Sequence, residues 1–304
     1  MKIFVTGAGG FIGGSIAARL VRDGHQVSGL IRRPEQADEL KALGIEPVIG
    51  SLDDRALLIA QAKAADGVIN AASSDHRGAV EALIEGLEGS NKPLLHTSGS
   101  SIVGDASGGE GSDAIYYEDN LPEPTADKAP RVAIDNLVLD AAKRGVRSSV
   151  LCNTLIYGHG AMATAKSVQL PRLLAQAKKS GIVRHVGPGR NIWSNVHIDD
   201  VADLYAGALE KSPAGTFYFV ESGEAAFRDM TTVMAKTLGL GAPQDWSLEE
   251  AKKEWGYEMA SYGLGSNSRV RGKHARELLG WEPKRRSVTD WISNEMVKAS
   301  EPGR

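Results

Sequence analysis

Short apolar runs alternate with segments of helical periodicity over roughly the first 150 residues of the chain. Residues 2–6 form the first run, and the apolar residues that follow, up to Val21, recur three and four positions apart. The runs that we predict to be further strands lie at residues 26–31, 47–50, 67–71, 93–97 and 147–152. The helices predicted between them lie at residues 35–43, 53–64, 78–87 and 131–143. Strands that alternate with helices in this way form right-handed crossovers, so we predict an α/β fold with a doubly wound parallel sheet.

The pattern divides the chain into a core and a smaller lobe. Residues 1–158 hold the alternating unit, and residues 196–220 are expected to return to it with one more helix and strand. Residues 159–195 and 221–304 are expected to form a smaller, mostly helical lobe that binds substrate. Residues 99–129 contain Gly, Ser, Asp and Pro without a period, which predicts a long surface loop, and loops of this length are often functional.

Composition narrows the class of protein. The 35 basic and 38 acidic residues leave a net charge of −3, which argues against a dedicated nucleic-acid-binding protein. The single cysteine, Cys152, excludes an intramolecular disulfide and fits a reducing compartment. No apolar run reaches the roughly 18 residues that a membrane span needs, and no spacing of His or Cys indicates a metal site. We therefore expect a cytoplasmic protein without a membrane, nucleic-acid or metal partner.

A glycine-rich turn joins the first predicted strand to the first predicted helix. It reads Thr-Gly-Ala-Gly-Gly-Phe-Ile-Gly, with Gly7, Gly10 and Gly13 three residues apart. In a strand–turn–helix unit the first glycine permits the tight turn, the second lets a pyrophosphate approach the backbone, and the third lets the helix pack on the sheet. The turn therefore predicts a dinucleotide-binding site.

This turn resembles that of the extended short-chain dehydrogenase/reductase family, which includes NAD-dependent epimerases and dehydratases. The resemblance continues along nearly the whole chain. The segments that carry it are 68–72 (Val-Ile-Asn-Ala-Ala), 155–158 (Leu-Ile-Tyr-Gly), 196–201 (Val-His-Ile-Asp-Asp-Val) and 278–283 (Leu-Leu-Gly-Trp-Glu-Pro). It implies a Rossmann-type core, an NAD(P)-dependent enzyme, a small-molecule substrate and, by analogy with members that pair through helices, a possible homodimer.

The end of the second strand bears on the choice of cofactor. NAD-selective proteins place a carboxylate there for the ribose hydroxyls, whereas here Ile31 is followed by Arg32 and Arg33. Guanidinium groups pair well with a 2′-phosphate, so we predict a preference for NADP(H), with NAD(H) possible. The residues expected to bind the cofactor are Gly7, Gly10, Phe11, Ile12, Gly13, Arg32, Arg33, Ser51, Leu52, Ala71, Ala72, Thr97, Arg131 and Asn153.

The usual catalytic pair of the resembled family is missing. That family uses Tyr-x-x-x-Lys on the helix before the sixth strand, together with a Ser or Thr after the fifth strand. Aligning the acidic position of that helix with Asp135 places Asp127 at the tyrosine and Arg131 at the lysine, and the usual serine falls near Gly99. The chain therefore resembles the atypical members of the family.

The proton donor must then lie elsewhere, and the long loop is the nearest source. We predict Tyr117 as general acid, Ser98 as a hydroxyl that orients or stabilises the substrate, and Arg131 as a fixed positive charge that holds the ribose. Tyr116 and His159 are the alternatives to Tyr117, as is a bound water molecule.

These observations predict an NADP(H)-dependent oxidoreductase that transfers hydride to a small carbonyl or imine-like substrate. Two alternatives stay open. One is a nucleotide-sugar epimerase or dehydratase. The arginines that could clamp its diphosphate are Arg184, Arg190, Arg269 and Arg271. The other is a non-catalytic NADP(H)-binding redox sensor, which the loss of the catalytic pair suggests.

Overall fold

Parallel strands form the centre of the structure, a computed structural model that describes residues 1–296. The seven-stranded sheet has the order β11-β7-β5-β4-β1-β2-β3, and every pairing in it is parallel. The strands are β1 (Lys2–Thr6), β2 (Gln26–Ile31), β3 (Ile45–Ile49), β4 (Gly67–Asn70), β5 (Pro93–Gly99), β7 (Arg147–Asn153) and β11 (Thr216–Val220). The predicted Rossmann-type α/β fold is therefore confirmed.

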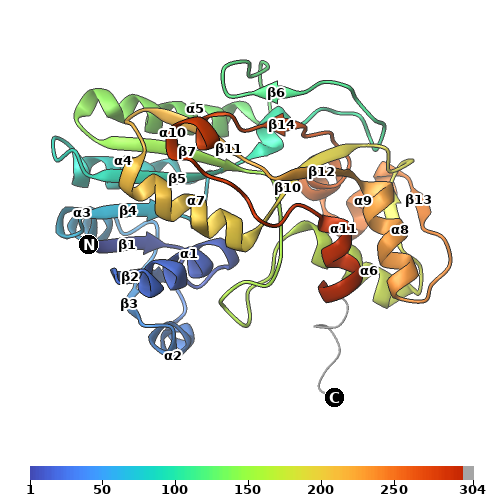
Figure 1. The fold of residues 1–304 in the computed structure, drawn as a ribbon, viewed down its shortest axis with the longest axis horizontal. Coiled ribbons are helices and arrows are strands. Elements are labelled where there is room, and N and C mark those ends of the chain that lie inside the picture. Colours follow the sequence, from blue (N-terminus) through green and yellow to red (C-terminus); the bar gives the residue numbers. More distant parts are fainter. Residues whose placement is uncertain (297–304) are drawn as a thin grey trace.

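Helices cover both faces of this sheet (Figure 1). Along β1, Ile3 and Val5 point into one apolar cluster and Phe4 into the other, as the alternation of a strand requires. The first cluster lies under α1 (Phe11–Arg22), α2 (Ala37–Ala42) and α7 (Ile198–Lys211). The second lies under α3 (Arg55–Ala64), α4 (Arg77–Leu87) and α5 (Ala129–Asp140).

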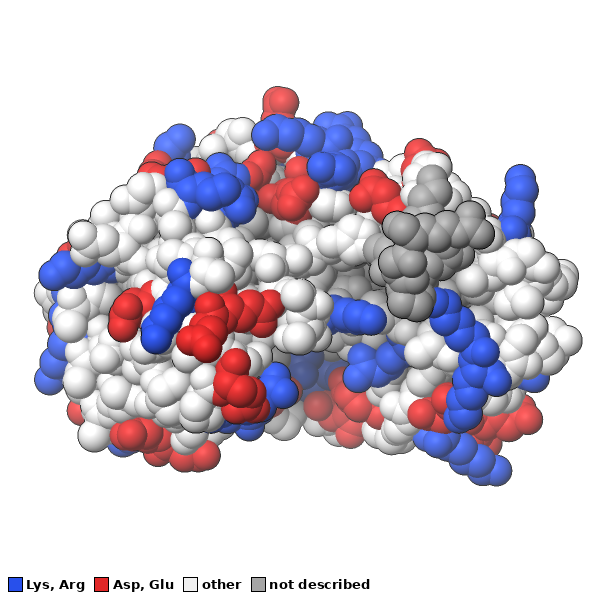
Figure 2. Space-filling view, turned by 90° about the horizontal axis from the view of Figure 1, so that it is seen from below, with Lys and Arg blue, Asp and Glu red and all other residues white. Residues whose placement is uncertain are grey.

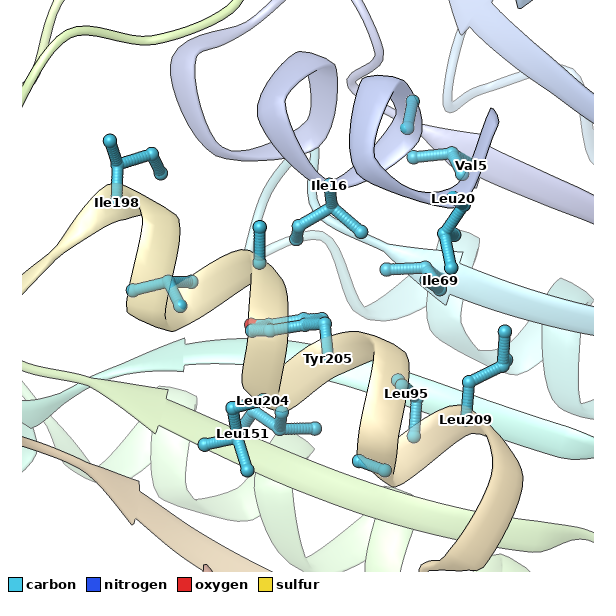
Figure 3. Packing of buried hydrophobic residues seen from close by; sticks show 14 of the residues in the cluster. Val5, Ile16, Leu20, Ile69, Leu95, Leu151, Ile198, Leu204, Tyr205 and Leu209 are labelled. Carbon is cyan, nitrogen blue, oxygen red and sulfur yellow. The ribbon is translucent and has the colours of Figure 1, made fainter. Parts of the chain in front are cut away.

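A buried tyrosine ties α7 to the sheet. Figure 3 shows Tyr205 on α7 among the aliphatic side chains of the first cluster, and its side chain is fully buried. Its hydroxyl lies 2.9 Å from Thr97 Oγ1 on β5 and accepts a hydrogen bond of 2.9 Å from Asn153 Nδ2 on β7. The helix is therefore held to two neighbouring strands by polar contacts as well as by packing.

The second lobe mixes helices with small sheets. β8 (Leu155–Tyr157), β10 (Ile192–His197) and β12 (Gly223–Ala226) form one sheet, and β9 (Arg184–Val186) pairs with β13 (Gln244–Trp246). Around them lie α6 (Gln169–Ser180), α8 (Phe227–Thr237), α9 (Leu248–Trp255) and α11 (Val288–Trp291). The lobe has an apolar cluster of its own, so it is a separate packing unit with more strand than the periodicity predicts.

One C-terminal segment differs from the predicted division of the chain. We expected all of residues 221–304 in the second lobe, but α10 (His274–Leu279) packs on the Rossmann core. Ala275 and Trp281 belong to the apolar cluster under α1 and α7, and Trp281 Nε1 donates to the backbone oxygen of Asp200 at 3.1 Å. Burying this indole stabilises the core more than exposure at the lobe surface would.

Most of the predicted surface loop is exposed or half-buried and without regular structure, but it holds two short elements that pack on the rest of the protein. Within residues 99–129, Ser100–Val103 form a buried 3-10 helix, η2, and β6 (Tyr116–Tyr117) pairs with β14 (Val270–Arg271). Asn267 Nδ2 donates to the Asp105 carboxylate at 2.9 Å, which holds the segment to a part of the chain 162 residues further on.

Among the residues described, no helix is long and apolar enough to span a bilayer.

Tyr205→Phe should lower the free energy of unfolding by about 1–3 kcal/mol, because it removes the hydroxyl that hydrogen-bonds the buried Asn153 side chain and the half-buried Thr97 hydroxyl. Urea unfolding followed by circular dichroism measures this change. The matched variant Tyr117→Phe alters a half-buried ring whose hydroxyl makes no hydrogen bond within residues 1–296, and it should shift stability by less than about 0.5 kcal/mol. Equal losses in both variants would contradict the structural role of Tyr205.

Candidate cofactor and active site

A cavity of about 550 Å³ opens at the carboxyl ends of β1 to β4. Parallel strands bring the loops that follow them to one edge of the sheet, which is where ligands bind in folds of this type. The predicted cofactor residues that line it are Gly7, Gly10, Arg32, Arg33, Ser51, Leu52, Ala71 and Ala72. Seen from below, the molecule is hollowed between core and lobe, and both basic and acidic side chains border this hollow (Figure 2).

The glycine turn has the shape that a pyrophosphate requires. Gly7 has a φ of +70°, and a Cβ on it would lie 2.7 Å from the Ala71 oxygen. A Cβ on Gly13 would lie 2.3 Å from the Gly7 oxygen, so α1 can pack this closely only without a side chain there. Gly10 is the N-cap of α1, has no side-chain cap, and no acidic residue follows it in the first turn. These residues fit a dinucleotide, whose phosphates would meet the positive end of α1.

Four predicted cofactor residues point their side chains elsewhere. Phe11 lines a second cavity with Gly160, and Ile12 packs against the apolar cluster under α1. Thr97 and Asn153 direct their polar atoms to Tyr205. Any contact of Phe11 or Ile12 with phosphate would therefore be made by backbone N–H groups at the start of α1, and a cofactor role for Thr97 and Asn153 stays a prediction.

Arg131 stands at the edge of the site, on the first turn of α5. Its Nε and Nη2 donate to the two carboxylate oxygens of Asp75 at 2.8 and 2.7 Å, and its Nη1 donates to Ser101 Oγ at 3.0 Å. The hydrogen bonds from Arg131 lower the pKa of Asp75. A Cβ on Gly99 would lie 3.6 Å from Nη1, so the position of the usual serine does face this guanidinium. Sequence reasoning missed Asp75 and Ser101, which only the fold brings together.

Ser98 does not face the cavity, contrary to our prediction. Its hydroxyl donates to Asp135 Oδ2 at 2.7 Å, and both side chains are almost completely buried. His96 Nε2 lies 3.7 Å from Asp135 Oδ1, and His96 Nδ1 lies 3.0 Å from Asn70 Nδ2. Burial raises the pKa of Asp135 to about 7 and lowers that of His96 to about 4. Strand alternation turns Ser98 into this polar interior, so it cannot orient a substrate in the structure described.

The place of the usual tyrosine holds a carboxylate that meets two phenols from the other lobe. Asp127 Oδ2 accepts hydrogen bonds from Tyr257 and Tyr262, each of 2.8 Å. Tyr117, our predicted acid, lies in β6 with its ring 4.5 Å from Lys273 Nζ, and its position is fixed by pairing with β14. The structure therefore does not bring Tyr117 to Arg131 or Asp127. No sequence signal marked Tyr262, which is 135 residues from Asp127.

Only two of the four arginines proposed as a diphosphate clamp meet in the structure, and they meet at a glutamate. Arg269 and Arg271 both pair with Glu224, at 2.8 and 3.0 Å. Arg190 lies 3.3 Å from Glu110, and the Arg184 guanidinium stacks 5.0 Å from the Trp246 ring.

Within residues 1–296, no group of three His, Cys, Asp or Glu side chains could hold a metal ion.

Comparisons with known proteins identify the family. The model of the NAD dependent epimerase/dehydratase family matches residues 3–220. A Schizosaccharomyces pombe protein described as uncharacterized is 33% identical, over 93% of this chain and 95% of its own. An Acremonium oxidase is 30% identical, over 93% and 92% of the two chains. A 2-alkyl-3-oxoalkanoate reductase of Stenotrophomonas maltophilia is 29% identical, over 79% and 76%.

Solved structures show the same fold. A dTDP-glucose 4,6-dehydratase of Bacillus anthracis in complex with NAD superposes with a TM-score of 0.79 at 16% identity, over 99% of this chain and 97% of its own. The chain belongs to the NAD dependent epimerase/dehydratase family, and it is an NAD(P)-dependent oxidoreductase of that family.

Gly10→Glu should abolish binding of the dinucleotide while the protein stays folded. Among the described residues other than its two chain neighbours, a Cβ on Gly10 would meet the Gly7 oxygen at 3.1 Å, a tight contact that a shift of a few tenths of an ångström relieves. The added carboxylate would repel the pyrophosphate. Titration of NADPH fluorescence measures binding. Gly207→Glu places the same side chain on α7, where nothing lies within 4 Å, and should leave affinity unchanged. Unchanged affinity in folded Gly10→Glu would contradict the site.

The raised pKa of the buried Asp135 carboxyl should make the stability of the protein depend on pH. This pKa is about 7 in the folded state against an ordinary 3.8, so between these values the folded state binds more protons than the unfolded chain. Stability should therefore fall as pH rises through that window. Asp135→Asn should remove this part of the slope, and the Tm of the variant relative to wild type should rise by at least about 3 °C from pH 5 to pH 8. Asp140→Asn, on the exposed side of the same helix, should leave the slope unchanged.

Proposed function

We propose that this enzyme uses NADP(H) to reduce the carbonyl or imine-like group of a small organic substrate. The observation that carries the choice of cofactor is the end of β2, where Arg32 and Arg33 line the cavity and no carboxylate follows Ile31. The carboxylate of Asp53 also lines the cavity, but it comes from the turn after β3 and lies 3.1 Å from His76 Nε2. Two guanidinium groups at this end favour a ligand that carries an additional phosphate.

The arrangement of charges supports small-molecule reduction over nucleotide-sugar chemistry. Epimerases and dehydratases of nucleotide sugars need groups that grip a diphosphate. Of the four candidate arginines, two are neutralised by one glutamate and the other two are engaged at separate places. The names of two relatives, a 2-alkyl-3-oxoalkanoate reductase and an oxidase, describe redox enzymes, and the first names a 3-oxo acid as its substrate. We infer that a ketone or a related C=N compound occupies the cleft between core and lobe.

Arg131 and Ser101 are the residues that we expect to hold the nicotinamide end of the cofactor. A bound nicotinamide cofactor supplies the hydride. Arg131 would hold the ribose hydroxyls, in exchange for part of its contact with Asp75, and it carries a charge that does not titrate. Ser101 keeps the guanidinium in position through its 3.0 Å hydrogen bond. The core therefore orients the cofactor, and the proton must come from another group.

The double variant Arg32→Ala/Arg33→Ala tests the cofactor preference. Loss of charge-assisted contacts worth about 1.5–3 kcal/mol should weaken NADPH binding by about ten- to a hundredfold and leave NADH binding nearly unchanged. Arg55→Ala, an exposed arginine that pairs with Glu85 on the outer face, serves as the control. A wild-type preference for NADH, or equal losses for both cofactors, would contradict NADP(H) selectivity.

Turnover separates the proposal from its alternatives. A panel of ketones, aldehydes, 3-oxo acids and a cyclic imine, followed by NADPH absorbance, should include a substrate that is reduced. NADPH binding without oxidation by any member of the panel would favour a redox sensor. Competitive inhibition by a nucleoside diphosphate at micromolar concentration would instead favour a nucleotide-sugar enzyme.

A further inference from the structure

We infer that Tyr262, from the second lobe, donates the proton to the substrate, with the buried Lys128 ammonium beside it. The inference rests on the proposed carbonyl reduction. The tyrosine–lysine pair that helix α5 lacks would thus be rebuilt across the two lobes, with the lysine from the core and the tyrosine from the lobe.

The position of the Tyr262 hydroxyl is the first observation. In the resembled family a phenol stands where this chain has Asp127, four residues before Arg131. The Tyr262 hydroxyl lies 2.8 Å from Asp127 Oδ2, so a phenol oxygen does lie within one hydrogen bond of that place. It arrives from a different element, the π-helix at Met259–Gly263.

The packing of the ring is the second observation. A Cβ on Gly104 would lie 3.3 Å from Tyr262 Cδ1, so the ring lies against the end of η2, the short helix that also carries Ser101. Tyr262 is only 7% exposed, and Ser266 Oγ donates to its backbone oxygen at 2.6 Å. The hydroxyl is therefore held in a fixed position on the side of the site that carries Ser101 and Arg131.

The charge beside the ring is the third observation. Lys128 Nζ lies 4.1 Å from the centre of the Tyr262 ring, and its side chain is 2% exposed. Its ion-pair partner is Glu258, from the same lobe as Tyr262. Burying an ammonium group is costly unless it is paired, so this arrangement is built for a positive charge at this place. A cation here stabilises a phenolate, which is what the family's lysine does for its tyrosine.

The proton step balances with these groups. A hydride, that is one proton with two electrons, would pass from a bound nicotinamide to the carbonyl carbon, so that the carbonyl is reduced and the cofactor is oxidised. The carbonyl π pair becomes an oxygen lone pair, and that oxygen takes the proton from Tyr262, so an alcohol and a phenolate remain. The phenolate recovers a proton from solvent, and Thr125 Oγ1, 3.4 Å away, can hydrogen-bond to it meanwhile.

Asp127 acts as a positioning residue in this scheme. In the structure it accepts hydrogen bonds from both phenols, so when Tyr262 turns its hydrogen towards a substrate, Tyr257 still satisfies the carboxylate. Tyr257 is the weaker candidate for the donor, because it is 55% exposed and the ammonium group over its ring, that of Lys252, lies 5.5 Å from the ring centre. Tyr262 combines the buried position with the neighbouring ammonium group.

The first test is Tyr262→Phe, assayed on the best carbonyl substrate of the panel above. The turnover number kcat should fall by about a hundredfold or more, as expected for loss of a general acid. NADPH affinity should stay within about twofold. The primary isotope effect with 4-deuterated NADPH should rise, because hydride transfer becomes the slow step. Tyr117→Phe should keep its turnover within about twofold.

The second test separates charge from packing. Lys128→Met should lower kcat by about tenfold or more, and Lys128→Arg should restore part of it, since the cation near the ring returns. Full turnover in folded Tyr262→Phe, or loss of turnover in Tyr117→Phe instead, would overturn this inference while leaving carbonyl reduction standing. Failure of wild-type protein to reduce any carbonyl of the panel would instead overturn the proposed function, and this inference with it.

Discussion

The close approach of the β1–α1 turn to the end of β4 is the constraint on which the cofactor cavity depends. Gly7 lies against the backbone of Ala71 and Ala72, and Gly13 lies against Gly7, at distances that leave no room for a side chain. This contact sets the direction of α1, so that its uncapped N-terminus faces the cavity. The arginines after β2 can contribute to the same cavity only because β2 is the direct neighbour of β1.

A second constraint is electrostatic and lies between the lobes. Lys128 is buried at the start of α5, and its partner Glu258 comes from the lobe, so neither lobe satisfies this charge alone. The two phenols on Asp127 cross the same boundary. The polar cluster therefore forms only when the lobe docks on the core. A change in the angle between the lobes would break the ion pair and the hydrogen bonds to Asp127 together.

The interior beneath the site is also polar. Thr6, Asn70, His96, Asp135 and Ser98 run from β1 to α5 below Arg131, all nearly fully buried. His96 and Asp135 have pKa values shifted towards their neutral forms, because burial penalises the charged forms. His96 is therefore neutral near pH 7, and Asp135 becomes neutral as the pH falls below about 7, so below that pH the core holds these polar side chains without a buried charge.

The sequence by itself determined the Rossmann-type fold, the glycine turn and the arginines at the end of β2. These depend on local patterns. The periods of strands and helices indicate the fold, and the residues that directly follow a parallel strand lie at the edge of the sheet where ligands bind. Tertiary structure decided the rest. Whether Ser98 faced the cavity depended on the register of β5, and the meeting of Tyr262 with Asp127 depended on how the lobe docks. Contacts between residues more than a hundred positions apart leave no periodic trace in the chain, because only the packing of complete elements brings them together.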